Sequence, residues 1–398
     1  MPNSNLLDAS RGIADWITGL RRRIHQHPET AFEEFETSRV VRETLDSLGI
    51  PYEHPFATTG VLGRIGNGNG PCVALRADMD ALPIHEESGV PFASQVPGKM
   101  HACGHDCHTA MLLGAARLLK ERESEIQGTV KLVFQPAEEG ENGGLVMCNE
   151  GILENPKVER AFGLHVWPYL PAGMIAGKAG VLLASVDMFD IVVTGRGGHA
   201  AIPHATIDPV ATAAKIVCEL QTIVSREVDP FSPAVLSVTA IHGGEAFNVI
   251  PETVALRGTI RGLTVPVMEQ LQRRIREIST GVAAANRCTA EVKFGETVIP
   301  PTVNDAECWE ITRRLGQEVL GQTNVADVST VMGGEDFSYI AQRVPACFAF
   351  VGVKAVGRET FGLHHSRFNP DEAALPVGTA MHVAFALDAL DSLRGGRN

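Results

Sequence analysis

The sequence lacks an excess of basic residues. Its 398 residues carry 34 Lys and Arg against 47 Asp and Glu, which gives a formal net charge of -13. A polyanion such as DNA would be repelled by this charge unless one face were locally basic. The one basic cluster, Arg21–Arg23, is short and runs into His25 and Pro28, as is typical of a helix end. We therefore expect no nucleic-acid partner.

Long apolar runs and paired cysteines are also missing. No stretch approaches the ~18 apolar residues of a membrane span. Residues 1–10 lack the basic start and apolar core of a signal peptide. The eight cysteines are scattered, without the C-x-x-C pairs of redox motifs or structural zinc sites. These absences argue against a disulfide framework, and they predict a cytoplasmic protein with reduced thiols and no membrane association.

What is present is an ordinary globular composition, with 44% hydrophobic and 20% charged residues. At ~150 residues per domain, the length suggests two or three domains. Apolar patterning predicts a strand at 72–77, a helix at 109–120 and a strand at 129–135. This order, with continuously apolar strands, indicates an α/β sheet covered by helices on both faces. Further strands are predicted at 61–65 and 346–352, and helices at 13–24, 36–48, 304–320 and 374–393.

The pattern changes near residue 184. Strands are predicted at 187–194, 234–242, 253–261 and 290–294, with helices at 208–228 and 265–284. The order βαββαβ is that of a ferredoxin-like α+β unit. We therefore expect an inserted domain at 184–297, within a catalytic domain formed by 1–183 and 298–398.

The densest chemical signal is the segment 100–108, MHACGHDCH, with three histidines, two cysteines and an aspartate. Its glycines indicate a loop that leads into a helix. Cys103 and His105 are two residues apart, so in an extended segment both side chains can reach one ion. Thiolate and imidazole favour Zn, Co, Ni or Fe(II) over Mg or Ca. A polar loop or a Cys103–Cys107 redox pair is the alternative, although C-x-x-x-C is not the redox spacing.

Other segments offer further ligands. Glu138 and Glu139 follow a predicted strand, so one carboxylate could bind an ion while its neighbour takes a proton from metal-bound water. His165 lies in an apolar run, and His364 and His365 lie in a loop before the last helix. Taken singly, these are more often a solvated acid pair, a core histidine and ordinary loop residues. Together they exceed the four ligands of one zinc site and favour two metals with a bridging hydroxide.

Two acids at the end of the strand 72–77 form another candidate group. Asp78 and Asp80 are two residues apart and share a face, so they could bind metal or orient a ligand imidazole. The alternative is an ion pair between Arg76 and one of these acids.

The inserted segment has its own polar group. His199 lies in the Gly-rich turn GRGGHAAIPH, Asn248 lies in FNVIP, and Arg261 ends a predicted strand. Such a set could receive a carboxylate, with Arg giving a two-pronged contact. The glycines do not match the G-x-G-x-x-G pattern of a nucleotide site. Loop structure and solvated charge are the alternative reading.

These motifs resemble those of the hippurate hydrolase, aminoacylase and auxin-conjugate amidohydrolase family of dinuclear metallopeptidases. The resemblance covers nearly the whole chain, from RRxIHxHPE near His25 through RADMDALPI, MHACGHDCH, FQPAEEG, GLHVWP, GRGGHAAIPH, FNVIP and GGEDF to LHHS. It implies a metallopeptidase-like α/β catalytic domain, a mixed sheet with helices on both faces. The ferredoxin-like insertion would be a lid or dimerisation domain.

The resemblance also implies roles for the residues. The metal ligands would be Cys103, His105, Glu139, His165 and His364. Glu138 would be the general base and proton shuttle, and Asp80 would orient a ligand or the base. The sequence does not separate Asp78 from Asp80, or His364 from His365.

The remaining implied roles concern the substrate. His199, Asn248 and Arg261 would hold its carboxylate and the developing oxyanion. In dimeric relatives the first two reach into the partner's active site. We therefore expect a homodimer or homotetramer assembled through the inserted domain.

The implied activity is metal-dependent hydrolysis of the amide bond of small N-acyl amino acids, similar to hippurate, to a carboxylic acid and a free amino acid. Two divalent ions per subunit, Zn, Mn, Co or Ni, would supply the metal-bound hydroxide, with Glu138 as the base. Alternatives within the family are a dipeptidase or carboxypeptidase and an N-acetyl-diaminopimelate deacetylase. From other classes, a metal-binding protein without catalysis and a thiol-based redox enzyme remain conceivable.

Overall fold

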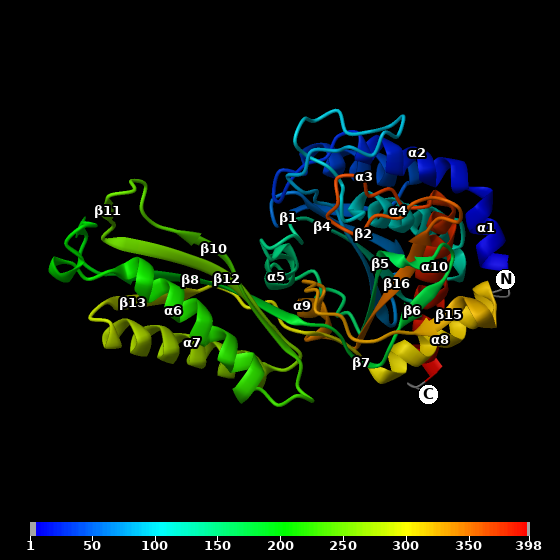
Figure 1. The fold of residues 1–398 in the computed structure, drawn as a ribbon. Helices are drawn as coiled ribbons and strands as arrows, with labels where there is room; N and C mark the ends of the chain where they lie inside the picture. Colours follow the sequence, from blue (N-terminus) through cyan, green and yellow to red (C-terminus); the bar gives the residue numbers. More distant parts are fainter. Residues whose placement is uncertain (1–4, 396–398) are drawn as a thin grey trace. The chain divides into compact units, whose positions relative to one another are not determined.

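The computed structural model describes residues 5–395, which form two compact units (Figure 1). Within the described range, unit 1 comprises the chain up to Leu182, Val303–Ser329 and the chain from Asp336 onward. Unit 2 comprises Leu183–Thr302 together with the short stretch Thr330–Glu335. The strands β7 (Gly180–Leu183) and β14 (Thr302–Asn304) lie where the chain passes from one unit to the other.

Unit 1 is built on an eight-stranded mixed sheet with the order β1-β2-β4-β3-β5-β16-β6-β15. The neighbouring strands β4, β3, β5 and β16 are mutually parallel, and β2 pairs antiparallel with β4. Every residue of β3 and β4 is buried, because both faces of the sheet are covered. The strands are β1 (Tyr52–Phe56), β2 (Gly60–Gly66), β3 (Cys72–Asp78), β4 (Thr129–Gln135), β5 (Arg160–Pro171), β6 (Ile175–Gly177), β15 (Val325–Asp327) and β16 (Ala346–Lys354).

Two long apolar helices form the centre of the unit 1 core. Helices α4 (His105–Glu121) and α10 (Leu375–Gly395) pack on each other and on β3 and β5, and each has 14 buried residues. Helix α5 packs on β4, and α9 packs on β16. The other helices of unit 1 are α1 (Leu6–Gly12), α2 (Ala14–His25), α3 (Phe35–Leu48), α5 (Gly143–Asn149), α8 (Ala306–Leu320) and α9 (Ser338–Ala341).

Helix α10, with the turn before it, is the one helix of the described range that is long and apolar enough to cross a membrane. This corrects the expectation that no segment would reach that length. Within the structure, 83% of its most apolar window is buried. A core helix passes the same test of length and composition, so the helix is weak evidence for a membrane span.

Unit 2 is a four-stranded antiparallel sheet, ordered β10-β12-β8-β13, with two helices packed on it. Alternate residues of β8 are buried, since one sheet face packs on the helices. The chain order βαββαβ and this strand order are ferredoxin-like. The elements are β8 (Ser185–Thr194), α6 (Pro209–Thr222), β10 (Ala234–His242), β12 (Thr253–Gly262), α7 (Val265–Ala285) and β13 (Thr289–Phe294). The short strands β9 (Gly198–His199) and β11 (Val249–Ile250) pair separately.

Candidate metal centre

The beginning of helix α4 brings the first two predicted ligands together. Gly104 precedes the helix with φ +87°, and a Cβ at this position would lie 2.4 Å from Cγ2 of Val166. Only glycine tolerates both conditions, so the chain can turn sharply between Cys103 and His105. The helix therefore begins at His105, four residues earlier than expected. Cys103, His105 and His165 have ligand atoms within 4.8 Å of one another, and all three are buried.

The hydrogen bonds of the histidines decide which ring nitrogens face the cluster. His165 donates from Nδ1 to the carbonyl of Val166 at 2.7 Å, and its Nε2 lies 3.3 Å from Sγ of Cys103. His105 donates from Nδ1 to Asp80 Oδ1 at 3.3 Å. Its Nε2 is buried without a hydrogen-bond partner in the described chain. Each ring is thus oriented through one nitrogen and offers the other as a ligand atom.

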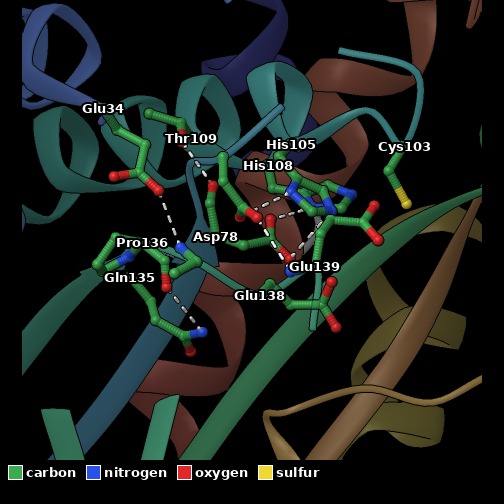
Figure 2. Close-up of polar contacts among 12 residues, drawn as sticks. Glu34, Asp78, Cys103, His105, His108, Thr109, Gln135, Pro136, Glu138 and Glu139 are labelled. Atoms are coloured by element: carbon green, nitrogen blue, oxygen red, sulfur yellow. Dashed lines mark hydrogen bonds and ion pairs between the residues drawn. The ribbon is translucent and has the colours of Figure 1, made fainter. Parts of the chain in front are cut away.

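The turn after β4 carries both glutamates (Figure 2). Ala137 in this turn has φ +57°, and its amide donates to the buried carboxylate of Glu34 at 3.0 Å. The amide of Glu139 donates to Asp80 Oδ2 at 2.9 Å. Ligand atoms of His105, Glu138 and Glu139 lie within 4.8 Å of one another. The turn therefore presents both carboxylates to the same cluster.

The structure distinguishes the two aspartates by their partners. Asp80 contacts the ring of His105 and the amide of Glu139, so it touches two predicted ligands. Asp78 accepts hydrogen bonds from His108 Nδ1 at 2.5 Å and from Arg76 at 2.8 Å, and its Oδ2 lies 3.7 Å from His105 Nε2. The ion pair between Arg76 and an aspartate is therefore present, and it involves Asp78.

The last predicted ligand comes from the loop before α10. His364 Nε2 lies 3.1 Å from Glu139 Oε1, and the backbone amide of His364 donates to Ala102. His364, Cys103 and Glu139 have ligand atoms within 4.8 Å of one another. The ring of His365 instead stacks on Phe361, with centroids 4.7 Å apart. Of the two histidines, His364 is the one that reaches the cluster.

The charges around the cluster suit a cation. Burial and the nearby Glu139 and Glu138 raise the pKa of the Cys103 thiol well above its usual value. Burial opposes protonation of His105, but Asp78 and Asp80 outweigh it and raise its pKa to about 10. In both cases the nearby carboxylates disfavour further negative charge and favour positive charge at this place. A divalent cation there would reverse the effect on the thiol and favour the thiolate.

The donor atoms fit a metal in chemistry as well as in charge. His105 Nε2 is buried and makes no hydrogen bond within the described residues. Unsatisfied buried acceptors are costly unless a partner is supplied. Sulfur, imidazole nitrogen and carboxylate oxygen together suit a first-row transition metal or zinc. The five predicted ligands therefore form a site that a metal would complete.

Glu138 has different surroundings from its neighbour. It is 8% exposed, and the backbone amide of Asp336 lies 3.4 Å from its Oε1. The Asp336 side chain is itself buried and accepts hydrogen bonds from Arg76, Gln135 and Gly144. Burial raises the pKa of Asp336 to about 6. The carboxylate of Glu138 is thus held beside the donor cluster, where it can exchange a proton with a water molecule bound at the cluster.

The three residues predicted to bind substrate all lie in unit 2. His199 on β9 pairs with Val249 on β11, and the carbonyl of Asn248 accepts the amide of Ala200. His199 and Asn248 are therefore neighbours on one short ribbon. Arg261 lies on β12, and its guanidinium donates to the carbonyl of Met332 at 2.7 Å.

Sequence reasoning missed some supporting residues of the centre. Glu34 holds the turn of the two glutamates through the amide of Ala137. Asp336 belongs to the motif GGEDF, which the sequence analysis noted. Nothing in that motif predicted that Asp336 would form an ion pair with Arg76. These contacts join segments up to 260 residues apart in the chain. Such pairings follow from the sheet order and leave no local signal.

Comparisons with known proteins agree with this site. The family model Peptidase family M20/M25/M40 matches residues 74–388. The chain is 46% identical to IAA-amino acid hydrolase ILR1-like 4 of Arabidopsis thaliana, over 99% of this chain and 90% of that protein. It is 41% identical to thermostable carboxypeptidase 2 of Saccharolobus solfataricus, over 94% and 95% of the two chains.

A solved structure supports the same relationship. The Bacillus subtilis YXEP protein, described as a dinuclear metal-binding peptidase from the M20 family, superposes with a TM-score of 0.82 at 36% identity. The match covers 96% of this chain and 99% of the other. The fold, the buried donor cluster and the full-length relatives lead to one identification: the chain belongs to peptidase family M20/M25/M40 and is a metal-dependent hydrolase of amide bonds.

Proposed function

We propose that the protein hydrolyses the amide bond of N-acyl amino acids similar to hippurate, and releases a carboxylic acid and a free amino acid. The observation that carries this proposal is the position of Glu138, whose carboxylate lies with His105 and Glu139 in one buried donor group. The relative named as an IAA-amino acid hydrolase supports an acyl–amino acid substrate.

Two divalent cations per subunit would be held by two donor groups that share Cys103. One group combines Cys103 with His105 and His165, and the other combines it with Glu139 and His364. The donor set accepts Zn, Mn, Co or Ni. When bound, these ions would acidify the attacking water and polarise the substrate carbonyl.

Glu138 is the residue that moves the proton. In the proposed reaction its carboxylate takes one proton from the attacking water as the carbon–oxygen bond forms. It then gives that proton to the amide nitrogen as the carbon–nitrogen bond breaks, so the amino acid leaves as a neutral amine. The Asp336 amide and the buried wall around Glu138 fix the direction of its carboxylate.

Unit 2 would supply the substrate carboxylate site and act as a lid. Arg261 offers a two-pronged contact to a carboxylate, and its pKa is lowered by partial burial, which leaves a poorly solvated cation in need of an anion. His199 and Asn248 would contribute donors to the carboxylate and to the developing oxyanion. Both are exposed on the ribbon formed by β9 and β11.

We also infer that the protein works in the cytoplasm as a homodimer or homotetramer assembled through unit 2. The strand β10 lies at an edge of the described unit 2 sheet and contains no acidic or basic residue other than His242. An unprotected edge of this kind favours pairing with another chain. Phe247, next to Asn248, is fully exposed on the same unit.

A carboxypeptidase is the second candidate, because a relative of that name is 41% identical over 94% of this chain. In that case the acyl part of the substrate would be a peptidyl group. The amino acid released and the carboxylate site in unit 2 would be the same. The two functions therefore differ only in what precedes the scissile bond.

The proposal is tested by release of free amino acid from N-acyl glycines and from dipeptides, with Zn, Mn, Co or Ni added to metal-free protein. We expect metal-dependent release from the N-acyl glycines, and faster release from dipeptides would favour the carboxypeptidase. Glu138→Gln keeps the shape of the side chain but cannot accept the proton. It should lower kcat by ~10² or more, with unchanged metal content. An equally active Glu138→Gln protein would contradict the assigned role.

A further inference from the structure

A buried arginine lies in the middle of the unit 1 sheet, among strands that are otherwise largely apolar. Arg76 belongs to β3, whose residues are all buried and which pairs with β4 on one side and β5 on the other. Taking a charged group out of water is costly, and the cost is offset only when partners satisfy the charge and its donors. The partners of Arg76 therefore show what this cation holds together.

The guanidinium of Arg76 donates to three side chains in three directions. Its Nε donates to Oε1 of Gln135, and its terminal nitrogens donate to Oδ2 of Asp78 and Oδ1 of Asp336, each at 2.8 Å. All three partners are fully buried. A planar guanidinium presents its donors in a fixed fork, which the single ammonium of a lysine cannot reproduce. Arg76 thus sets the positions of three buried side chains relative to one another.

One pair of these partners leads to Glu138, and we call Gln135 and Asp336 the base arm. Beside its bond with Arg76, Asp336 accepts hydrogen bonds from Nε2 of Gln135 and from the amide of Gly144, both at 2.7 Å. The backbone amide of Asp336 donates to Oε1 of Glu138 at 3.4 Å. The anchored side chain therefore orients the amide that meets the carboxylate of Glu138. A displacement of about 1 Å in such a group can cost as much as 10²-fold in rate.

The third partner leads to the predicted ligand His165, and we call Asp78 and His108 the ligand arm. Asp78 accepts from Nδ1 of His108 at 2.5 Å (Figure 2). Nε2 of His108 accepts from the amide of Val166 at 2.8 Å, so the ring proton of His108 lies on Nδ1. The carbonyl of Val166 in turn accepts from Nδ1 of His165 at 2.7 Å. This arm therefore fixes both the strand and the ring of His165, whose Nε2 faces the donor cluster.

We propose that Arg76 is a positioning residue, which ties the base Glu138 to the metal ligand His165 through these two arms. All of the residues involved belong to unit 1. With one rigid cation between the arms, the base and the ligand keep a fixed separation in the protein. The base arm rests on the proposed hydrolysis, because that reaction gives Glu138 a rate to control. The ligand arm rests on the donor cluster alone.

The test reads the two arms by two different measurements. Asp336→Asn keeps the shape of the side chain but loses the charge that pairs with Arg76. It should lower kcat for N-acyl glycines by about tenfold or more, with KM and zinc affinity within about twofold of wild type. His108→Asn can donate to Asp78 but does not reach Val166. It should weaken zinc binding by about tenfold or more in calorimetry, with kcat at saturating zinc within about threefold. Arg76→Lys should show both losses.

Arg160→Lys is the matched control. Arg160 is a buried arginine at the first residue of β5, and its guanidinium contacts α8 and α10 rather than either arm. The same substitution there should change neither kcat nor zinc affinity. If Asp336→Asn does not fold, Gln135→Met weakens the base arm at an uncharged residue and should lower kcat alone. If His108→Asn does not fold, His108→Gln removes the contact with Asp78 and should lower zinc affinity alone.

The outcomes separate this inference from the proposed function. Loss of kcat alone through the base arm, of zinc affinity alone through the ligand arm and of both in Arg76→Lys supports it. A merely structural network predicts that kcat, zinc affinity and melting temperature fall together in the variants of either arm, and that result would overturn it. Unchanged kcat in Asp336→Asn or unchanged zinc affinity in His108→Asn would overturn it too. A wild type without any amide hydrolysis would overturn the proposed function and the base arm, and zinc titration would still decide the ligand arm.

Discussion

Asp80 shows how one side chain can support two predicted ligands. Its Oδ1 accepts from the ring of His105, and its Oδ2 accepts from the backbone of Glu139. The first contact fixes the direction of an imidazole, and the second fixes the turn that carries a carboxylate. The hydrogen bond from the His105 ring to the Asp80 carboxylate also makes the ring a stronger electron donor to a cation.

We predict that Asp80→Asn weakens metal binding by about 10- to 100-fold while the protein stays folded. The amide retains the shape of the side chain but loses the charge that polarises His105. Titration of metal-free protein with Zn or Mn in a calorimeter measures the affinity. Asp190→Asn, an exposed acid of unit 2, is the matched control. Equal affinities for wild type and Asp80→Asn would contradict this role.

Glu34 gives a second prediction at the level of a single side chain. Burial raises its pKa to about 7, against hydrogen bonds from Thr59 and Ala137 that favour the charged form. An acid whose pKa is higher in the folded state binds its proton more tightly there. The native protein therefore loses stability as the pH rises from about 4.5 to 7.

Glu34→Gln should remove this loss, because the amide can accept from Ala137 and donate to Thr59 without a charge. At pH 8 the variant should be more stable than wild type, by up to about 3 kcal/mol. The difference should vanish about one pH unit or more below 4.5, where the wild-type residue is neutral in both states. Denaturant unfolding at several pH values measures it. A constant difference across this range would refute the shift.

At the level of elements, the structure confirms most of the long segments predicted by apolar periodicity. Strand β4 begins and ends at the predicted residues, and α7 extends one residue further than expected. The short strands β6 and β15, of three residues each, were not predicted. Their positions follow from pairing with neighbours distant in sequence, so three residues carry too little local pattern to identify them.

The sequence predicted the candidate metal ligands, but it predicted few of the residues that hold those ligands in place. Cys103, His105 and Glu139 lie in motifs of unusual residues at the start of α4 or just after β4, and local sequence marks such positions. His165 lies within β5 and His364 in a loop, so their local sequence is less distinctive. The start of α4 was placed too late, because the polar residues His105–His108 read as a loop. In the structure these residues occupy the first turn of α4. All four side chains are buried, and His108 forms a hydrogen bond with Asp78. These interactions outweigh the modest helix propensity of the four residues.

The start of helix α4 depends on one residue, Gly104. Alanine there would have to adopt a positive φ and would approach Val166 to 2.4 Å. We expect Gly104→Ala to lower the free energy of unfolding by about 1–3 kcal/mol, and to reduce metal content by displacing Cys103 from His105. Thermal unfolding and elemental analysis measure the two effects. Gly12→Ala in α1 is the control, because nothing lies within 4 Å of its added Cβ. Normal metal content in Gly104→Ala would contradict the argument.

For the whole molecule, the division into two units separates the two kinds of chemistry. Unit 1 contains every predicted metal ligand and the predicted proton carrier, Glu138, and unit 2 contains every predicted carboxylate-binding residue. Unit 1 has large buried strands and helices around its centre, which hold ligand atoms rigidly. Unit 2 has its own apolar core, so it can retain its shape independently of the metal centre. Loss of metal should therefore affect unit 1 before unit 2.

Unit 2 also presents exposed apolar side chains that would contact a second copy in the proposed dimer. Ile241 at the end of β10 is 56% exposed, and Val249 on β11 is 51% exposed. Both line a hollow of about 880 Å³ on this unit. Apolar residues gathered around an uncharged edge strand are suited to a self-complementary contact, in which the same patch meets itself across a two-fold axis.

We predict that Ile241→Lys converts the proposed dimer to a monomer, because two such lysines would face each other across the proposed two-fold contact and would have to lose water there. Sedimentation equilibrium measures the mass, and Val356→Lys, an equally drastic change on the surface of unit 1, should leave it unchanged. If His199 and Asn248 complete the partner's site, the Ile241→Lys monomer should also lose hydrolysis while it keeps its metal. A fully active monomer would show that each chain builds its substrate site alone, and a Ile241→Lys protein that stays dimeric would place the contact elsewhere on the molecule.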